Sequence, residues 1–207
     1  MAIASVQQAV TANALGKFDF RSPSLEIICD HLAEPRKHSI LDLGTPLRAN
    51  IEFFSSVPCT LFVEDLYESL IALPPPGDSE GPNTYERRVT QALAHSAETR
   101  FDLIFGWDLF NYMRSDQIHA LMKRLSGSCR SGTLLFIMIS TAPVIPERPA
   151  KITVAHEGLV SYESTSAPGK SNPRYTPLAL ERMMPGFRLL HYFLLAESMQ
   201  DYLFSFG

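Results

Sequence analysis

Polar residues and a glycine follow three apolar runs of this chain, at the point where each run ends. They are Gly44, Glu64, Asp65, Trp107 and Asp108. A glycine lets a ligand approach the backbone closely, carboxylates accept hydrogen bonds, and an indole can stack on a flat ring. Because ligands of open α/β sheets bind outside the carboxyl ends of the parallel strands, we expect these residues to converge on one cleft.

Each of these residues also has a purely structural interpretation, which the sequence leaves open. Gly44 can serve an ordinary strand-to-helix turn, since glycines punctuate such turns. The acidic pair 64–65 can be a solvated strand end, because Asp and Glu are normally exposed. Trp107 can be a half-buried core residue.

The elements that would position these residues alternate between apolar runs and helical patterns, which predicts one α/β domain over 1–207. The predicted strands are 39–43, 60–63, a buried run that starts at 100, 133–141, 188–195 and 202–206. The predicted helices are 6–15, one capped by Ser22 and ended by Pro35, 45–55, 66–73, 85–97, 115–125 and 176–184. The N-terminal region 1–36 is therefore expected to be helical, and the short last connection makes the final two strands antiparallel.

A segment near 142–175 differs in kind from the rest, because it is rich in Pro, Ser and Gly. Within it, 151–164 alternates like a hairpin that turns at Glu157 and Gly158. We expect an insertion outside the main sheet that covers or flanks the substrate side, as loops that carry specificity often do.

Composition narrows the function classes. The net charge of −4, from 18 basic and 22 acidic residues, gives no electrostatic footprint for nucleic acid. The start lacks the basic region of a signal peptide, and no apolar run approaches the ~20 residues of a membrane span, so we expect a cytoplasmic protein without membrane partners. The three cysteines form no CxxC pair and the six histidines lack ligand spacing, so we expect no metal.

Three motifs, in this order, resemble the class I S-adenosylmethionine-dependent methyltransferase family. They are ILDLG at 40–44, FDLIFGWDLFNYM at 101–113 and LALERMMPGFRLL at 178–190. The resemblance covers about 24–207 and implies a Rossmann-like fold, with a mostly parallel sheet that ends in an antiparallel hairpin. In that family the last strand is inserted beside the fifth. No convincing third strand is visible between 65 and 100.

The resemblance places the cofactor, S-adenosylmethionine, at the turn after the first strand. Asp42 and Gly44 would meet it, and a helix starting at Thr45 would offer its positive end to the carboxylate. The family's further glycines are replaced by Pro46, which has no amide hydrogen, and by Arg48, which is bulky but could pair with the carboxylate. We therefore predict an intact fold with weakened or lost cofactor binding.

The resemblance also assigns roles to the later residues. Either Glu64 or Asp65 would accept hydrogen bonds from the ribose hydroxyls. Trp107 stands where the family contacts adenine or the substrate. Asp108 and His156 are weak candidates for a base, because methyl transfer from a sulfonium needs little acid–base machinery.

The first functional hypothesis is therefore S-adenosylmethionine-dependent methylation of a small molecule or a protein side chain. The alternative is a catalytically silent methyltransferase-like subunit that binds or regulates a protein partner. A nicotinamide-dependent oxidoreductase is a weaker third hypothesis, because it would need G-x-G-x-x-G after the first strand and the chain offers only Gly44.

Overall fold

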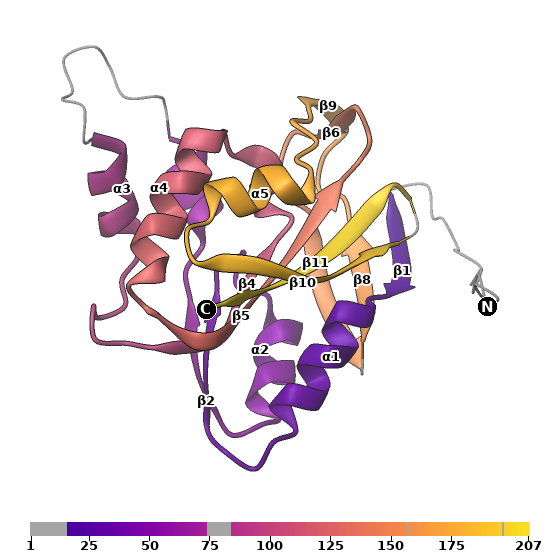
Figure 1. Ribbon diagram of the computed structural model, residues 1–207. Coiled ribbons are helices and arrows are strands. Elements are labelled where there is room, and N and C mark those ends of the chain that lie inside the picture. Colours follow the sequence, from indigo (N-terminus) through magenta and orange to yellow (C-terminus); the bar gives the residue numbers. More distant parts are fainter. Residues whose placement is uncertain (1–15, 74–83, 157, 196) are drawn as a thin grey trace.

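The computed structural model describes residues 16–73, 84–156, 158–195 and 197–207 and is a mixed α/β structure (Figure 1). The predicted helix 6–15 lies outside these residues. The central sheet has six strands in the order β10-β11-β5-β4-β2-β3. Their bounds are β2 His38–Asp42, β3 Cys59–Val63, β4 Phe101–Trp107, β5 Cys129–Ser140, β10 Phe187–Leu194 and β11 Met199–Phe206.

The pairing within this sheet confirms the predicted fold class. Strands β3, β2, β4 and β5 are parallel, whereas β11 runs antiparallel between β5 and β10. The last strand is thus inserted beside β5, as the resemblance implied. The described residues between 65 and 100 contain no strand, so β3 forms the edge of the sheet.

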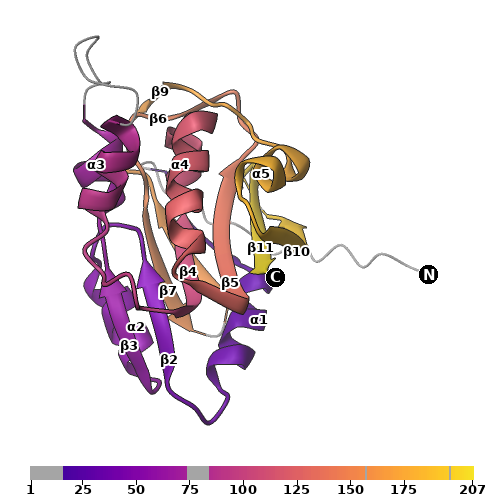
Figure 2. The same cartoon turned by 60° about the vertical axis from the view of Figure 1, so that its left-hand side comes forward.

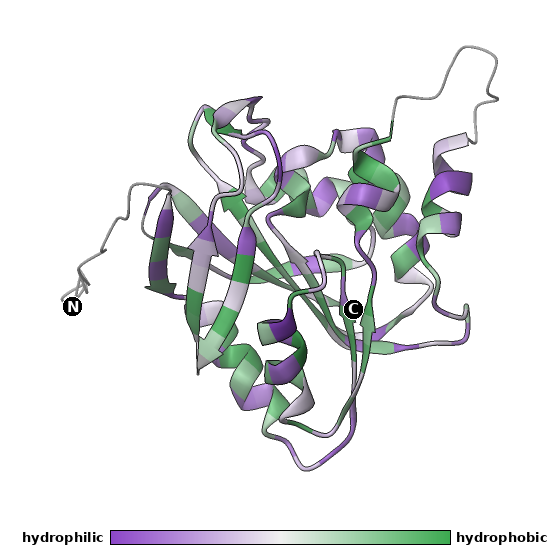
Figure 3. Cartoon of the chain, turned by 180° about the vertical axis from the view of Figure 1, so that it is seen from behind, coloured by the Kyte–Doolittle hydropathy of each residue, from purple (hydrophilic) through white to green (hydrophobic). Residues whose placement is uncertain are grey.

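Helices cover both faces of the sheet (Figures 1 and 2). They are α1 Pro23–Leu32, α2 Arg48–Ser55, α3 Thr84–Ala92, α4 Ser115–Ser126 and α5 Pro177–Met183, with a π-helical turn η1 Tyr67–Ile71 and a 3-10 turn η2 Leu109–Tyr112. One apolar core joins the sheet to α3, α4 and α5, and a second joins it to α1 and α2. Figure 3 shows the strands at the centre of the sheet as mainly apolar, which suits burial on both faces.

The start of α1 follows the predicted chemistry. The Ser22 hydroxyl accepts a hydrogen bond from the Leu25 amide at 3.1 Å, and Pro23 occupies the first helical position. The Ser22 hydroxyl also donates to Oδ2 of buried Asp201 at 2.5 Å, and Ser24 Oγ donates to Oδ1 at 2.9 Å. These bonds tie the start of α1 to strand β11.

The predicted start of the helix after β2 needs correction. Helix α2 begins at Arg48 with Leu47 as its cap, rather than at Thr45 and Pro46. Its cap position carries no side-chain hydrogen bond, because leucine has no polar group to offer. Pro46 therefore precedes the helix and removes no donor from its first turn.

The N-terminal region is not entirely helical. Residues Lys17–Arg21 form strand β1, which pairs antiparallel with β8 Leu159–Glu163. Strand β8 also pairs with β7 Lys151–His156, so the segment 151–163 is a hairpin within a separate three-stranded sheet. A short ribbon, β6 Val144–Pro146 with β9 Pro168–Ser171, completes the insertion.

The three-stranded sheet is fixed to α2 by one buried side chain. Asn50 Nδ2 donates to the Ile152 carbonyl at 2.9 Å, and Asn50 Oδ1 accepts from the Val154 amide at 3.0 Å. A single amide thus pairs both ways with β7, which fixes its register against the helix.

Among the described residues, no helix is long and apolar enough to cross a membrane.

Candidate functional site

The turn after β2 is occupied by an indole. Trp107 Nε1 donates a hydrogen bond to Asp42 Oδ1 at 2.6 Å, and the Gly44 amide donates to the same oxygen at 2.9 Å. A methyl group added at Gly44 would lie only 2.6 Å from Trp107 Cδ1. Glycine is therefore required here by the close approach of the indole.

The position of Trp107 is set by its backbone and by the core. Its φ of 45° lies in the left-handed region, which costs a non-glycine residue about 1–3 kcal/mol. Its ring stacks on Phe105, with 4.8 Å between centroids, and meets Phe136 edge-on. These contacts and the bond to Asp42 hold the strained conformation and place the indole across the strand ends.

Hydrogen bonds hold the insertion over the same strand ends. The Ala150 amide donates to Asp108 Oδ2 at 3.0 Å, and burial raises the pKa of Asp108 to about 7. On either side, the Tyr112 hydroxyl donates to the Arg148 carbonyl at 2.8 Å and the Tyr67 hydroxyl to the Glu147 carbonyl at 3.2 Å. Side chains of Tyr67, Tyr112 and Asp108 therefore bind three backbone groups of the segment 147–150.

Little space is left between the indole and this segment. The cavity at the strand ends measures about 20 Å³, against roughly 300–1,000 Å³ for the pockets that bind small molecules. It has room for about one water molecule. Its walls are Gly44, Thr45, Leu47, Asn50, Tyr67, Trp107, Asp108, Leu109, Pro149, Ala150 and Ile152. In this conformation, the residues do not fit S-adenosylmethionine.

The two acids after β3 have separate environments. Glu64 is buried, where its Oε1 bonds both the amide and the Nδ1 of His95 at 3.0 Å. Asp65 is half-buried and accepts a hydrogen bond from the Glu68 amide at the start of η1, at 3.3 Å. Burial raises the pKa of Asp42 to about 6, and the negative charge of Asp65 adds to this effect. Asp65 therefore influences the protonation of Asp42 in the cleft, whereas Glu64 forms its hydrogen bonds with His95.

The other residues predicted to form the site contribute little to the cleft. The Arg48 side chain is 91% exposed and pairs with Glu52 at 2.7 Å, so it neither blocks the cleft nor offers a clamp within it. Thr45 lines the small cavity without capping a helix. The His156 side chain lies outside the described residues. No group of three or more His, Cys, Asp or Glu side chains in the described part of the chain could hold a metal.

The sequence pointed to Trp107 but not to the residues that hold segment 147–150 over the cleft. Tyr67 lies in no motif, Tyr112 lies in the motif at 101–113 without a role of its own, and segment 147–150 lies far along the chain from the strands it covers. The available signal was indirect. Pro146 and Pro149 favour an extended segment between the ribbon and the hairpin, but they do not say where that segment docks.

Comparison with known proteins supports the same fold. No protein-family model matches the chain, and no curated protein matches it. A solved structure of Burkholderia thailandensis 1,6-didemethyltoxoflavin-N1-methyltransferase, with 1,6-didemethyltoxoflavin and S-adenosylhomocysteine bound, aligns with a TM-score of 0.50 at 14% identity over 89% of this chain and 77% of that one. The glycopeptide N-methyltransferase MtfA complexed with sinefungin also aligns at 0.50, with 8% identity over 90% and 99%. The chain therefore has the class I S-adenosylmethionine-dependent methyltransferase fold.

Proposed function

We propose that this chain is a methyltransferase-fold protein whose cofactor cleft is closed by its own residues. It would act as a non-catalytic binding or regulatory subunit for a protein partner. One observation carries the proposal: the Trp107 indole lies over Gly44, bonded to Asp42, where the fold would place adenosylmethionine. The cofactor can enter only if this side chain leaves.

The energetic consequence can be estimated from the contacts that must break. A ligand in the cleft would displace the bond from Trp107 to Asp42 and, for a larger ligand, the bond from Ala150 to Asp108. A hydrogen bond to a charged group contributes about 1.5–3 kcal/mol, so each loss reduces ligand affinity roughly tenfold to hundredfold. We expect S-adenosylmethionine to bind no tighter than about 100 μM.

A second candidate function, an S-adenosylmethionine-dependent methyltransferase, is favoured by one observation. Asp65 stands at the end of β3, near enough to Asp42 to contribute to its raised pKa, which suits a carboxylate that would bind a ribose. The acceptor would be a small molecule or a protein side chain. This function requires an open conformation, in which Trp107 and segment 147–150 have moved away.

Calorimetric titration with S-adenosylmethionine and S-adenosylhomocysteine separates the two functions without knowledge of the acceptor. The proposal predicts no measurable heat, or dissociation constants weaker than about 100 μM for both ligands. Low micromolar binding of either ligand by the wild-type protein would establish a working cofactor site and refute the proposal.

A further inference from the structure

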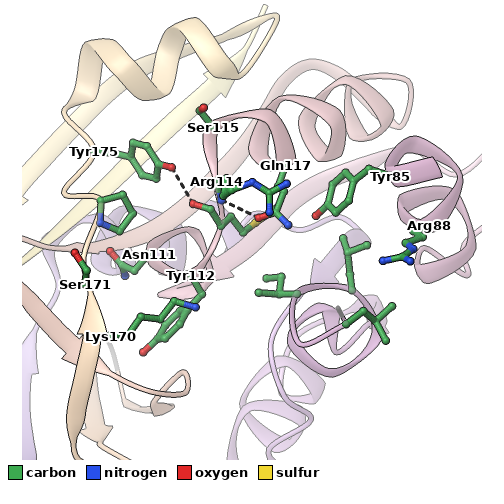
Figure 4. A pocket seen from close by; sticks show the side chains of 15 residues that line it. Tyr85, Arg88, Asn111, Tyr112, Arg114, Ser115, Gln117, Lys170, Ser171 and Tyr175 are labelled. Carbon is green, nitrogen blue, oxygen red and sulfur yellow. Dashed lines mark hydrogen bonds between the residues drawn. The ribbon is translucent and has the colours of Figure 1, made fainter. Parts of the chain in front are cut away.

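A second cavity, of about 560 Å³, lies beyond the closed cleft and within the size range of small-molecule pockets (Figure 4). It is bounded by η1, the start of α3, the η2 turn, the first turn of α4 and the end of β9. Tyr67 and Tyr112 meet edge-on between the two sites, with ring centroids 5.7 Å apart. Tyr67 faces the closed cleft and Tyr112 lines the larger cavity.

The charged side chains among the described lining residues of this cavity are all basic. Arg88, Arg114 and Lys170 line it, and none of the described lining residues is acidic. Asp116, outside the lining, binds the Arg114 guanidinium at 3.1 and 2.9 Å and offsets part of that charge. Lys170 Nζ lies 5.5 Å from the centre of the Tyr112 ring. In a protein of net charge −4, this local excess of cations favours an anionic ligand.

A buried hydroxyl at the cavity wall points to a hydrogen-bond acceptor. The Tyr85 hydroxyl is buried and has no hydrogen-bond partner among the described residues. Figure 4 shows Tyr85 and Arg114 pointing toward the same part of the cavity. An unsatisfied buried hydroxyl is costly, and a ligand oxygen that accepted a hydrogen bond from it would remove that cost.

The rest of the lining is apolar or aromatic. Leu70, Ile71 and Leu73 contribute aliphatic surface, and the rings of Tyr85 and Tyr112 add flat faces. Such walls favour a planar apolar body, because aromatic rings stack with offset or edge-on geometry. We propose that this cavity binds a small anion with an aromatic body, of the aryl phosphate or aryl carboxylate class.

The site is tested with 1-naphthyl phosphate, followed by calorimetry and by the shift in thermal unfolding. The matched probes are 1-naphthol, which lacks the charge, and inorganic phosphate, which lacks the ring. We expect the aryl phosphate to bind below about 1 mM and each control probe to bind at least tenfold more weakly. No heat at about 5 mM, or equal binding of 1-naphthol, would overturn the proposal.

Variants then locate the site. Lys170→Gln should weaken 1-naphthyl phosphate about tenfold because it removes a positive charge, and Tyr85→Phe several-fold because it removes a hydroxyl donor. Tyr85→Phe should leave the unfolding temperature unchanged or raise it, since it removes a buried hydroxyl without a described partner. Lys123→Gln, on the exposed face of α4 and paired with Glu86, is the control and should change nothing. Unchanged affinity in both cavity variants would place the ligand elsewhere and contradict the proposal. Neither adenosyl ligand is used, so the outcome is independent of the cofactor cleft.

Discussion

The two cavities beside the carboxyl ends of the strands differ in what fills them. The cleft at Gly44 is filled by an indole and an inserted backbone segment, so only about 20 Å³ remains. Its neighbour beyond Tyr112 keeps about 560 Å³ and a positively charged wall. A fold can therefore keep its sheet order while the space available to a ligand at the strand ends lies in a neighbouring cavity, on the other side of the Tyr67 and Tyr112 rings.

The pH dependence of stability should show the largest effect. Because the pKa of Asp108 is raised to about 7, the folded protein holds a proton that the unfolded chain, with an ordinary value of 3.8, has lost. Stability from this group is therefore complete below about pH 4 and is lost as pH rises toward 7, by on the order of 4 kcal/mol. Asp108→Asn should remove this slope in urea unfolding measured between pH 4 and 8.

A control of opposite sign is available for that experiment. Arg114 lowers the pKa of Asp116, so stability from Asp116 is present above about pH 4 and lost as pH falls. Asp116→Asn should leave the Asp108 slope intact. If Asp108→Asn unfolds with the same pH slope as the wild type, the buried anchor for Ala150 is not present in solution.

Replacing the glycine under the indole should have the next largest effect. Gly44→Ala places a methyl group 2.6 Å from Trp107 Cδ1 and 3.2 Å from Asp42 Oδ1. We expect a loss of about 1–3 kcal/mol in the free energy of unfolding, the usual cost of overpacking. Gly127→Ala is the control, because its nearest new contact is at 3.5 Å and its backbone is right-handed. Equal unfolding midpoints for the two variants would argue against the close contact.

Opening the closed cleft should change its affinity for adenosyl ligands. Trp107→Gly removes the indole and also the strain of a positive φ, so S-adenosylhomocysteine should bind about tenfold to hundredfold more tightly than to the wild type. Tyr192→Ala, which deletes a 55% exposed ring on β10, should leave this affinity unchanged. A Trp107→Gly variant that folds but gains no affinity would mean that the site has lost more than space.

The smallest effect is expected at Arg48. Its side chain is exposed and paired with Glu52 outside the cleft, so Arg48→Gly should not change the affinity for adenosyl ligands. Loss of the surface pair accounts for at most about 0.5 kcal/mol of stability, and glycine within the first turn adds roughly 1 kcal/mol. Tighter binding in Arg48→Gly, measured by calorimetry, would restore the sequence-based view of this arginine as an obstruction.

The fold was predictable because its signals are local. Apolar runs, the cap at Ser22 and the short final connection predicted the parallel sheet and its antiparallel end. Strand β1 was missed because it is short and its partner, β8, lies far along the chain in the insertion, where only the pairing of β8 within its own hairpin was predicted. Long-range pairing of this kind leaves little trace in a single sequence.

The closure of the cleft was predictable only in part. Pro46 and Arg48 indicated a departure from the usual glycine loop, but neither residue closes the site. Closure depends on the backbone angle of Trp107 and on contacts between Asp108 and a segment forty residues away along the chain. Both are tertiary features, which a single sequence does not reveal. The acids at 64–65 could be located by their spacing from the first strand, but only their hydrogen-bond partners in the structure tell the two apart.

Trp107 is the only tryptophan of the chain, so its fluorescence reports the central claim directly. The indole is buried against Phe105 and Phe136, and its emission should resist quenching by acrylamide until the protein unfolds. Addition of S-adenosylhomocysteine at about 5 μM should leave the emission of the wild-type protein unchanged. An indole that is readily quenched in the native protein, or a saturable change in its emission at low micromolar ligand, would contradict the closed cleft.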